Sequence, residues 1–135
     1  MATTDQTAAP SKVMLWTGRV LTALVVLFLI MDGAMKFMDL EIVRTTTIKL
    51  GWPVALNPLI GTIELVCLVL YAVPRTAVLG AVLMTGLLGG AIASHLRNGD
   101  PLFSHTLFGV YVGLMAWGGL WLRDEKLRAL IPLRR

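Results

Sequence analysis

Cysteine and charge are both scarce in this chain of 135 residues. The single cysteine, Cys67, excludes an intramolecular disulfide and a redox centre built on a pair of thiols. Charged residues make up 15% of the sequence, against about 25% in soluble domains. Hydrophobic residues make up 56%, and the mean hydropathy is +0.76. Because a soluble fold of this length could not bury so much apolar surface, the composition predicts a membrane protein.

The sequence also lacks a phosphate-binding loop, a nucleophile elbow and the spacing of a zinc site, so we predict neither a catalytic residue nor a metal site. The net charge of +4 would favour nucleic-acid binding in a soluble protein. Here the basic residues lie mostly at the termini and in loops beside apolar stretches. We therefore expect them to meet the lipid bilayer, with no nucleic-acid partner.

Four apolar stretches predict the fold, because an α-helix needs about 20 residues to cross the hydrocarbon of a bilayer. Two of the links are short turn signals, Pro74-Arg75 and Asn98-Gly99-Asp100-Pro101. Short links make neighbouring helices antiparallel. We predict an all-α membrane protein, an up-down four-transmembrane-helix bundle. It forms one domain over 13–122, with spans at about 13–38, 54–73, 76–96 and 104–122.

Three further segments complete the predicted organisation. Residues 1–12 form a polar tail, and no small-residue cleavage site follows the first apolar run, so we expect an uncleaved first helix. The link 39–53 mixes apolar and polar residues and is expected to lie at the membrane interface. Residues 123–135 form a basic amphipathic tail, in which Leu127, Leu130 and Ile131 are expected to face lipid.

Lysine and arginine set the expected orientation. With four spans, both termini and the 74–75 link share one side of the membrane. That side carries eight basic residues: Lys12, Arg19, Arg75, Arg123, Lys126, Arg128, Arg134 and Arg135. The other side carries four: Lys36, Arg44, Lys49 and Arg97. Since basic residues concentrate on the cytoplasmic side, we predict that both termini are cytoplasmic.

Small residues are expected to mark the contacts between helices, because lipid supplies no hydrophobic drive for helix association. Gly86 and Gly90 lie four residues apart on the third span, and Gly109 and Gly113 lie four apart on the fourth. We predict that these glycines pack the two spans closely together.

Ionisable residues inside the spans are the candidate functional residues, because charge is costly in hydrocarbon. Asp32 and Lys36 stand four residues apart on the first span, a spacing that suits a salt bridge. Glu64 shares one stripe of the second span with Asn57 and Tyr71 and is predicted to face the bundle interior. Three arrangements are open for it: a protonated acid, an ion pair with Lys36 across the bundle, or a carboxylate wetted by a cavity.

Two histidines, His95 and His105, flank the turn between the third and fourth spans. His105 shares a stripe with Gly109 and is expected to point at a neighbouring helix. With Asp32 and Lys36 in the same layer, the histidines predict a polar pocket. The alternatives are charges that only neutralise each other, histidines with a purely structural role, and histidines that ligate a metal or haem.

Several motifs in the chain resemble the DoxX-like family of small four-helix bacterial membrane proteins. They are Asp32-Gly33-Ala34-Met35-Lys36, Leu50-Gly51-Trp52-Pro53, Ile60-Gly61-Thr62-Ile63-Glu64-Leu65, Gly89-Gly90-Ala91-Ile92-Ala93-Ser94-His95-Leu96-Arg97, Gly99-Asp100-Pro101 and Trp121-Leu122-Arg123. The resemblance covers about residue 16 to the C-terminus. It implies a bundle in the bacterial inner (plasma) membrane, with relatives linked to thiosulfate:quinone oxidoreduction, to complexes that handle oxidative or thiol stress, or to membrane-protein assembly. By position, the polar residues of the family fall on Lys36, Glu64 and His95.

The leading functional hypothesis is an accessory subunit that docks on a redox or other membrane complex. In it, Lys36 or His95 hydrogen-bonds a quinone or lipid headgroup, and Glu64 relays a proton. The absence of a cysteine pair argues against direct thiol chemistry. A small proton-coupled transporter that uses Glu64 is one alternative, and a purely structural or assembly subunit is another. The expected partners are the lipid bilayer and other membrane subunits, or further copies of the chain.

Overall fold

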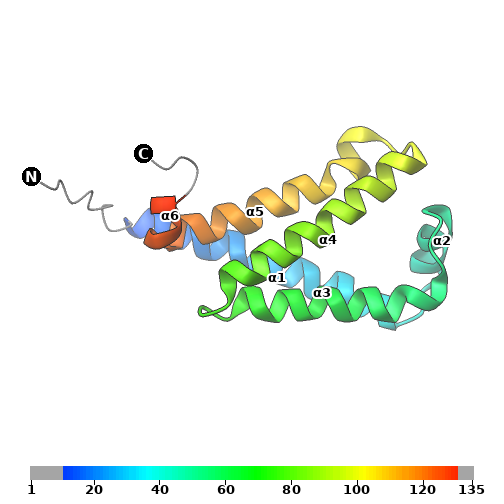
Figure 1. Ribbon diagram of the computed structural model, residues 1–135, viewed down its shortest axis with the longest axis horizontal. Helices are drawn as coiled ribbons and strands as arrows, with labels where there is room; N and C mark the ends of the chain where they lie inside the picture. The colour runs from blue at the N-terminus through cyan, green and yellow to red at the C-terminus, as the bar shows by residue number, and fades with distance from the viewer. Residues whose placement is uncertain (1–10, 131–135) are drawn as a thin grey trace, which may run out of the picture.

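Four long helices run antiparallel and form one bundle (Figure 1). The computed structural model describes residues 11–130. The predicted polar tail up to residue 10, and Ile131, Arg134 and Arg135 of the predicted basic tail, lie outside the described residues. The elements are α1 (Lys12–Phe37), α2 (Glu41–Lys49), the 3-10 turn η1 (Val54–Leu56), α3 (Asn57–Ala72), α4 (Ala77–Asn98), the π-helical turn η2 (Leu102–Thr106), α5 (Phe108–Arg123) and α6 (Glu125–Leu130).

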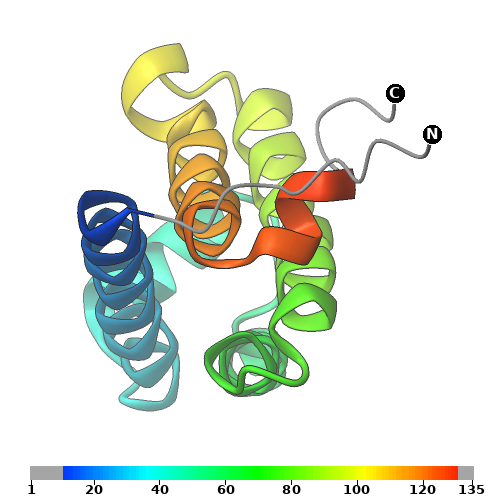
Figure 2. The ribbon, with the colours of Figure 1, turned by 90° about the vertical axis from the view of Figure 1, so that its left-hand side faces the viewer.

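The arrangement confirms the predicted all-α bundle. Seen along the helices, each long helix packs against two neighbours, in the order α1, α3, α4, α5 around the bundle (Figure 2). Three segments are long and apolar enough to cross a membrane: Lys12–Phe37, Val54–Ala72 and Ala77–Asn98. The fourth helix, α5, has 16 residues and is about 24 Å long. The π-helical turn η2 precedes it, so the predicted interval 104–122 is covered by two elements.

Local signals explain where the helices begin and end. The Ser11 side chain accepts a hydrogen bond from the Met14 amide and caps the start of α1. Pro58 lies in the first turn of α3, where its missing N–H costs nothing. Gly99 ends α4 with a left-handed backbone (φ 72°), which glycine adopts without strain. Pro101 starts η2, in which the Thr106 amide reaches back five residues to the Pro101 carbonyl.

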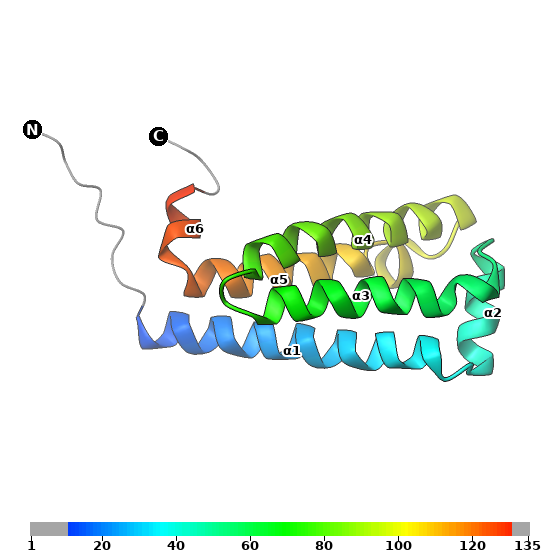
Figure 3. The same cartoon turned by 60° about the horizontal axis from the view of Figure 1, so that its bottom comes forward.

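The segment that follows α1 crosses one end of the bundle as helix α2 (Figure 3). Its C-terminal loop is fixed to α4 by two hydrogen bonds. Arg97 Nη2 donates to the Leu50 carbonyl at 2.6 Å, and Trp52 Nε1 donates to Ser94 Oγ at 3.1 Å. Gly51 lies between these contacts with φ 82°, and a Cβ atom there would lie 2.8 Å from the Arg97 guanidinium. The link predicted to lie at the interface is thus anchored to the end of α4.

One buried residue, Tyr71 of α3, contacts the other three long helices, two through its hydroxyl and one through its backbone. Its hydroxyl donates to the Ala116 carbonyl of α5 at 2.7 Å and lies 3.4 Å from the Thr22 hydroxyl of α1. On α4, Gly80 packs directly on the Tyr71 backbone, and a Cβ atom on Gly80 would lie 2.2 Å from the Tyr71 nitrogen. The surrounding core is formed by Val25, Leu29, Cys67, Leu68, Ala77, Ala81, Met84, Val112, Ala116, Leu120 and Leu127.

Of the four glycines predicted to pack α4 against α5, Gly109 and Gly113 lie at the contact and Gly86 and Gly90 do not. Gly109 packs tightly, since an added Cβ would lie 2.9 Å from the Ile92 side chain, and Gly113 is 3.8 Å from Leu88 by the same measure. Gly86 and Gly90 are exposed, and a Cβ on either would meet no atom within 4 Å. Gly86 is exposed because it lies about 200° around the axis of α4 from the buried Met84, on the opposite face of the helix.

The C-terminal helix corrects one further expectation. Leu127 is buried in the core, whereas Leu130 is exposed, so the prediction that Leu127 faces lipid is wrong. Asp124 explains the difference, because its Oδ1 accepts hydrogen bonds from the amides of Lys126 and Leu127 and starts α6 in a new direction. Arg128 then donates to the Trp121 and Leu122 carbonyls at the end of α5.

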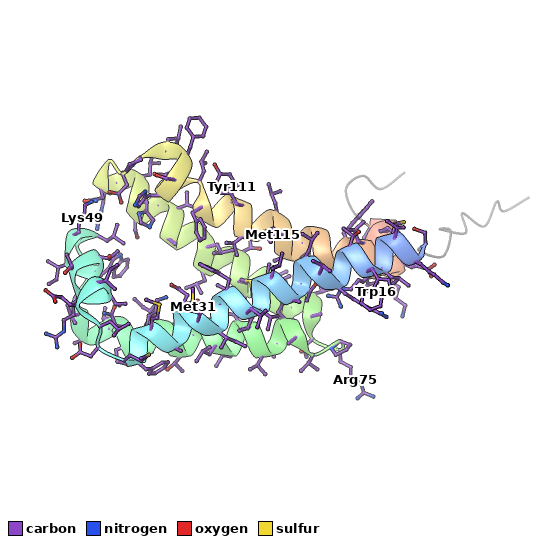
Figure 4. The ribbon with its side chains drawn as sticks, turned by 180° about the vertical axis from the view of Figure 1, so that it is seen from behind. Trp16, Met31, Lys49, Arg75, Tyr111 and Met115 are labelled. Carbon is purple, nitrogen blue, oxygen red and sulfur yellow. The ribbon has the colours of Figure 1, made fainter. Side chains whose placement is uncertain are left out.

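The described ends of the bundle differ in basic residues. Trp16 and Arg75 lie toward the end that carries α6, and Lys49 lies at the opposite end (Figure 4). The first end thus holds six of the basic residues predicted to share one side: Lys12, Arg19, Arg75, Arg123, Lys126 and Arg128. That this end is cytoplasmic remains a prediction of the positive-inside rule.

The orientation can be tested by cysteine labelling, because the native Cys67 is buried and gives little background. We expect a membrane-impermeant maleimide added to intact cells to label Thr45→Cys on α2 and to leave Arg75→Cys unlabelled. The wild-type chain is the control for Cys67. Labelling of R75C alone would reverse the predicted orientation.

Because the Tyr71 hydroxyl links α3 to α1 and α5, we predict that the protein becomes less stable when this hydroxyl is removed. Tyr71→Phe should lower the free energy of unfolding by about 1 kcal/mol. Tyr111→Phe is the matched control, because the Tyr111 hydroxyl binds the Phe103 carbonyl on an exposed face. Unfolding in lipid nanodiscs would measure both variants, and equal losses would refute the special role of Tyr71.

Candidate functional site

The strongest polar feature within the spans is a group of three charged side chains, Asp32 and Lys36 on α1 and Glu64 on α3. Lys36 Nζ donates to Glu64 Oε2 at 2.8 Å and also to Asp32 Oδ2. The Glu64 side chain is 5% exposed, that of Lys36 18% and that of Asp32 43%. We call these residues the charge triad. Of the three arrangements that the sequence left open for Glu64, the structure contains the ion pair with Lys36.

Close contact between α1 and α3 brings the triad together. Gly33 follows Asp32 directly, and Gly61 precedes Glu64 by one helical turn. A Cβ atom on Gly61 would lie 3.2 Å from the Gly33 carbonyl and 3.1 Å from Lys36 Cβ. Because neither glycine has a side chain, the two backbones approach closely enough for Lys36 to reach across to Glu64.

The triad is incompletely satisfied. Two carboxylates face one ammonium, so its formal charge is −1 when all three groups are ionised. Glu64 Oε1 is buried and has no hydrogen-bond partner among the described residues. A buried acceptor without a donor costs about 1–3 kcal/mol. The triad therefore lacks one hydrogen-bond donor for its buried carboxylate.

His95 belongs to a second polar cluster, at the turn after α4. Its Nδ1 donates to Asp100 Oδ2 at 2.7 Å, and Asn98 donates to Asp100 Oδ1 at 2.7 Å. Lys49 of α2 lies 3.6 Å from the same carboxylate. These donors hold the pKa of Asp100 below its usual value, with the hydrogen bond from His95 as the largest cause. The sequence indicated Asp100 only as part of a turn, and nothing local in it identified Lys49 as a neighbour.

His105 is placed differently from its expected position. Its side chain is exposed on η2, and its Nδ1 lies 2.7 Å from the Ser104 hydroxyl. The neighbouring Thr106 is buried instead. The π-helical turn explains this, because its wider spacing rotates His105 off the stripe that a regular helix would share with Gly109. The two histidine rings are 6.0 Å apart.

The five predicted pocket residues therefore form two groups. Within residues 11–130, no hydrogen bond or ion pair joins the charge triad to His95 or His105. The same part of the chain contains no set of three side chains arranged to hold a metal ion. A shallow apolar groove lies beside the α1–α3 contact, and none of the predicted pocket residues lines it. It is formed by Phe37, Thr62, Leu65, Val66, Val69 and Leu70.

The Asp100 cluster predicts a pH-dependent contribution to stability. Since the pKa of Asp100 is lowered by folding, its carboxylate stabilises the fold above about pH 3.8, and this contribution is lost as the pH falls through the folded pKa. Asp100→Asn should therefore lower the melting temperature at pH 7, and the difference from wild type should shrink below pH 3.8. Thermal unfolding in detergent across pH would measure this. Glu41→Gln, on the exposed face of α2, is the control, and a pH-independent difference for D100N would contradict the prediction.

Comparison with known proteins places the chain in a family. The model of the DoxX-like family matches residues 20–119, which include the charge triad and both histidines. The comparison with curated proteins and that with solved structures gave no match. The family match extends over more than half of the sequence and agrees with the helical bundle and its membrane-spanning helices. This chain belongs to the DoxX-like family and is a multi-pass membrane protein.

Proposed function

We propose that this DoxX-like membrane protein is an accessory subunit of a larger membrane complex, quinone-linked or otherwise, and that its charge triad holds the polar headgroup of a quinone or lipid. The observation that carries the proposal is the buried oxygen Glu64 Oε1, which has no donor among the described residues. We place the protein in the bacterial inner membrane with both termini in the cytoplasm, in line with its family and its basic residues.

The triad has the groups needed to bind a headgroup. An ammonium has three N–H donors, and two of those on Lys36 already serve Asp32 and Glu64, so one remains for a ligand oxygen. Glu64 can accept or release a proton at the oxygen that Lys36 does not bind. Asp32 is the most exposed of the three and is the part that a ligand meets first.

Met31 lies beside the triad on α1 and is exposed. The α4–α5 pair diverges from the α1–α3 pair toward the end that carries α2 (Figures 1 and 4). Met31, next to Asp32 on α1, is 54% exposed and points into the space between the pairs (Figure 4). Methionine is a flexible apolar side chain that adapts to a partner's shape. We expect a bound headgroup at Asp32 to contact Met31.

A small proton-coupled transporter is the second candidate, and the same carboxylate favours it. Two acids that share one ammonium can exchange a proton for a cationic substrate. Proton-driven efflux from liposomes that is lost in Glu64→Gln would support this function. A purely structural subunit is the third candidate, and for it the same substitution would change stability alone.

The proposed role is tested by native mass spectrometry of the full chain extracted gently from its own membrane. We expect a bound quinone or lipid, together with a larger complex. Glu64→Ala should lower ligand occupancy about tenfold, because a hydrogen bond to a charged group is lost.

His95→Ala is the matched control, since His95 binds Asp100 and not the triad. Its ligand occupancy should equal that of the wild type. Unchanged occupancy in E64A would refute headgroup binding at the triad. A ligand-free homo-oligomer would favour the transporter, and a large assembly without a redox partner would favour the structural subunit.

A further inference from the structure

Three methionines lie on one face of α1 in its last two turns. Met31, Met35 and Met38 are spaced four and three residues apart, so their side chains fall within an arc of about 60° around the helix axis. Met38 ends the helix with a helical backbone, so the same spacing holds up to it. We call these three residues the methionine stripe. It gathers three of the seven methionines of the chain at the end of α1 that leads into α2.

The methionine stripe is not part of the hydrophobic core. Met31 is 54% exposed and Met38 is 64% exposed, and Met35 is half-buried. Met31 points into the space between the two helix pairs (Figure 4). Leu24 and Leu27 continue the same face toward the start of α1 and are exposed as well. Contact with lipid requires an apolar side chain but no sulfur, so the change from leucine to methionine points to a ligand for the sulfur atoms.

The chemistry of the thioether selects the ligand. A thioether is an uncharged, soft donor, and soft donors favour Cu(I) over hard ions such as magnesium or calcium. Residues three and four apart on a helix have their Cβ atoms about 5–6 Å apart, and a methionine side chain is unbranched and flexible. Met35 can therefore share one ion with either Met31 or Met38. We propose that the methionine stripe binds Cu(I), with Met35 as the ligand common to both pairs.

The charges around the stripe favour a cation. Met35 and Met38 lie at the C-terminal end of α1, where unpaired carbonyl groups form the negative end of the helix dipole. The carboxylate of Asp32, the residue after Met31, is 43% exposed. Lys36, the cation in the same turn, is already paired with two carboxylates, which leaves the charge triad with a formal charge of −1. The stripe shares no residue with the triad, so this site does not depend on the proposed headgroup role.

Metal titration of the full chain in phosphatidylcholine nanodiscs tests the site. The probes are Ag⁺, a soft ion of the same charge, and Cu(I) kept reduced under anaerobic conditions in competition with a chromogenic chelator. We expect Met35→Leu to weaken binding of both ions at least about tenfold, because it removes the shared ligand. Met31→Leu and Met38→Leu should each weaken binding only about twofold, because one of the two pairs remains. Leucine and methionine are similar in volume, so the three variants should fold.

Met115→Leu on α5 is the matched control, because it removes a thioether that lies outside the stripe and should bind as the wild type does. Cys67→Ala and the double variant H95A/H105A remove the thiol and the imidazoles. Both should also retain binding, and the X-ray absorption spectrum of the Cu(I)-loaded wild type should show sulfur neighbours.

Three results would overturn the proposal. The first is failure of the wild type to bind either ion. The second is wild-type affinity in M35L. The third is loss of binding in C67A or H95A/H105A with no loss in M35L, which would assign the ion to the thiol or to the imidazoles. None of these results bears on headgroup binding at the charge triad, which is measured separately through Glu64→Ala.

Discussion

The close contact of α1 with α3 at Gly33 and Gly61 is the constraint on which the polar interior depends. A carboxylate or ammonium left alone in an apolar bundle is strongly unfavourable, whereas a paired one is tolerated. Two residues without side chains let the helix backbones approach, and the approach lets Lys36 reach Glu64. Even so, one ammonium cannot satisfy two carboxylates fully, and the unsatisfied oxygen is what gives the site its chemical character.

The residues that hold the bundle together are largely distinct from those that carry charge. Tyr71, Gly80 and the buried apolar side chains around them join all four long helices. The second polar cluster, centred on Asp100, ties the loop after α4 to α2. This division separates the stability of the fold from the chemistry of the triad. Substitution within the triad therefore leaves the contacts of Tyr71 with the other long helices in place.

Sequence reasoning reached the fold but only part of the site. Hydropathy and turn residues were sufficient for the antiparallel bundle, since both signals are local. The pairing of Lys36 with Glu64 was one of three open arrangements. The spacing of residues along a helix predicts which way the Glu64 side chain faces, but it does not identify the residue that the side chain contacts. The position of His105 depended on the π-helical turn after Pro101, which regular helical spacing does not foresee. The burial of Leu127 likewise depended on the direction in which Asp124 starts α6.

The order of the charged residues along the chain has a consequence for biogenesis. All three members of the triad lie on α1 and α3, so every partner in these ion pairs is synthesised before α4 and α5. The first helical hairpin can thus partition into the bilayer as an electrostatically paired unit. The predicted span 76–96 of the second hairpin has no formal charge, and its charged residues Arg97 and Asp100 lie in the connection to α5. The hydrogen bond from the Tyr71 hydroxyl to the Ala116 carbonyl joins α3 to α5, so it can form only after α5 has been synthesised.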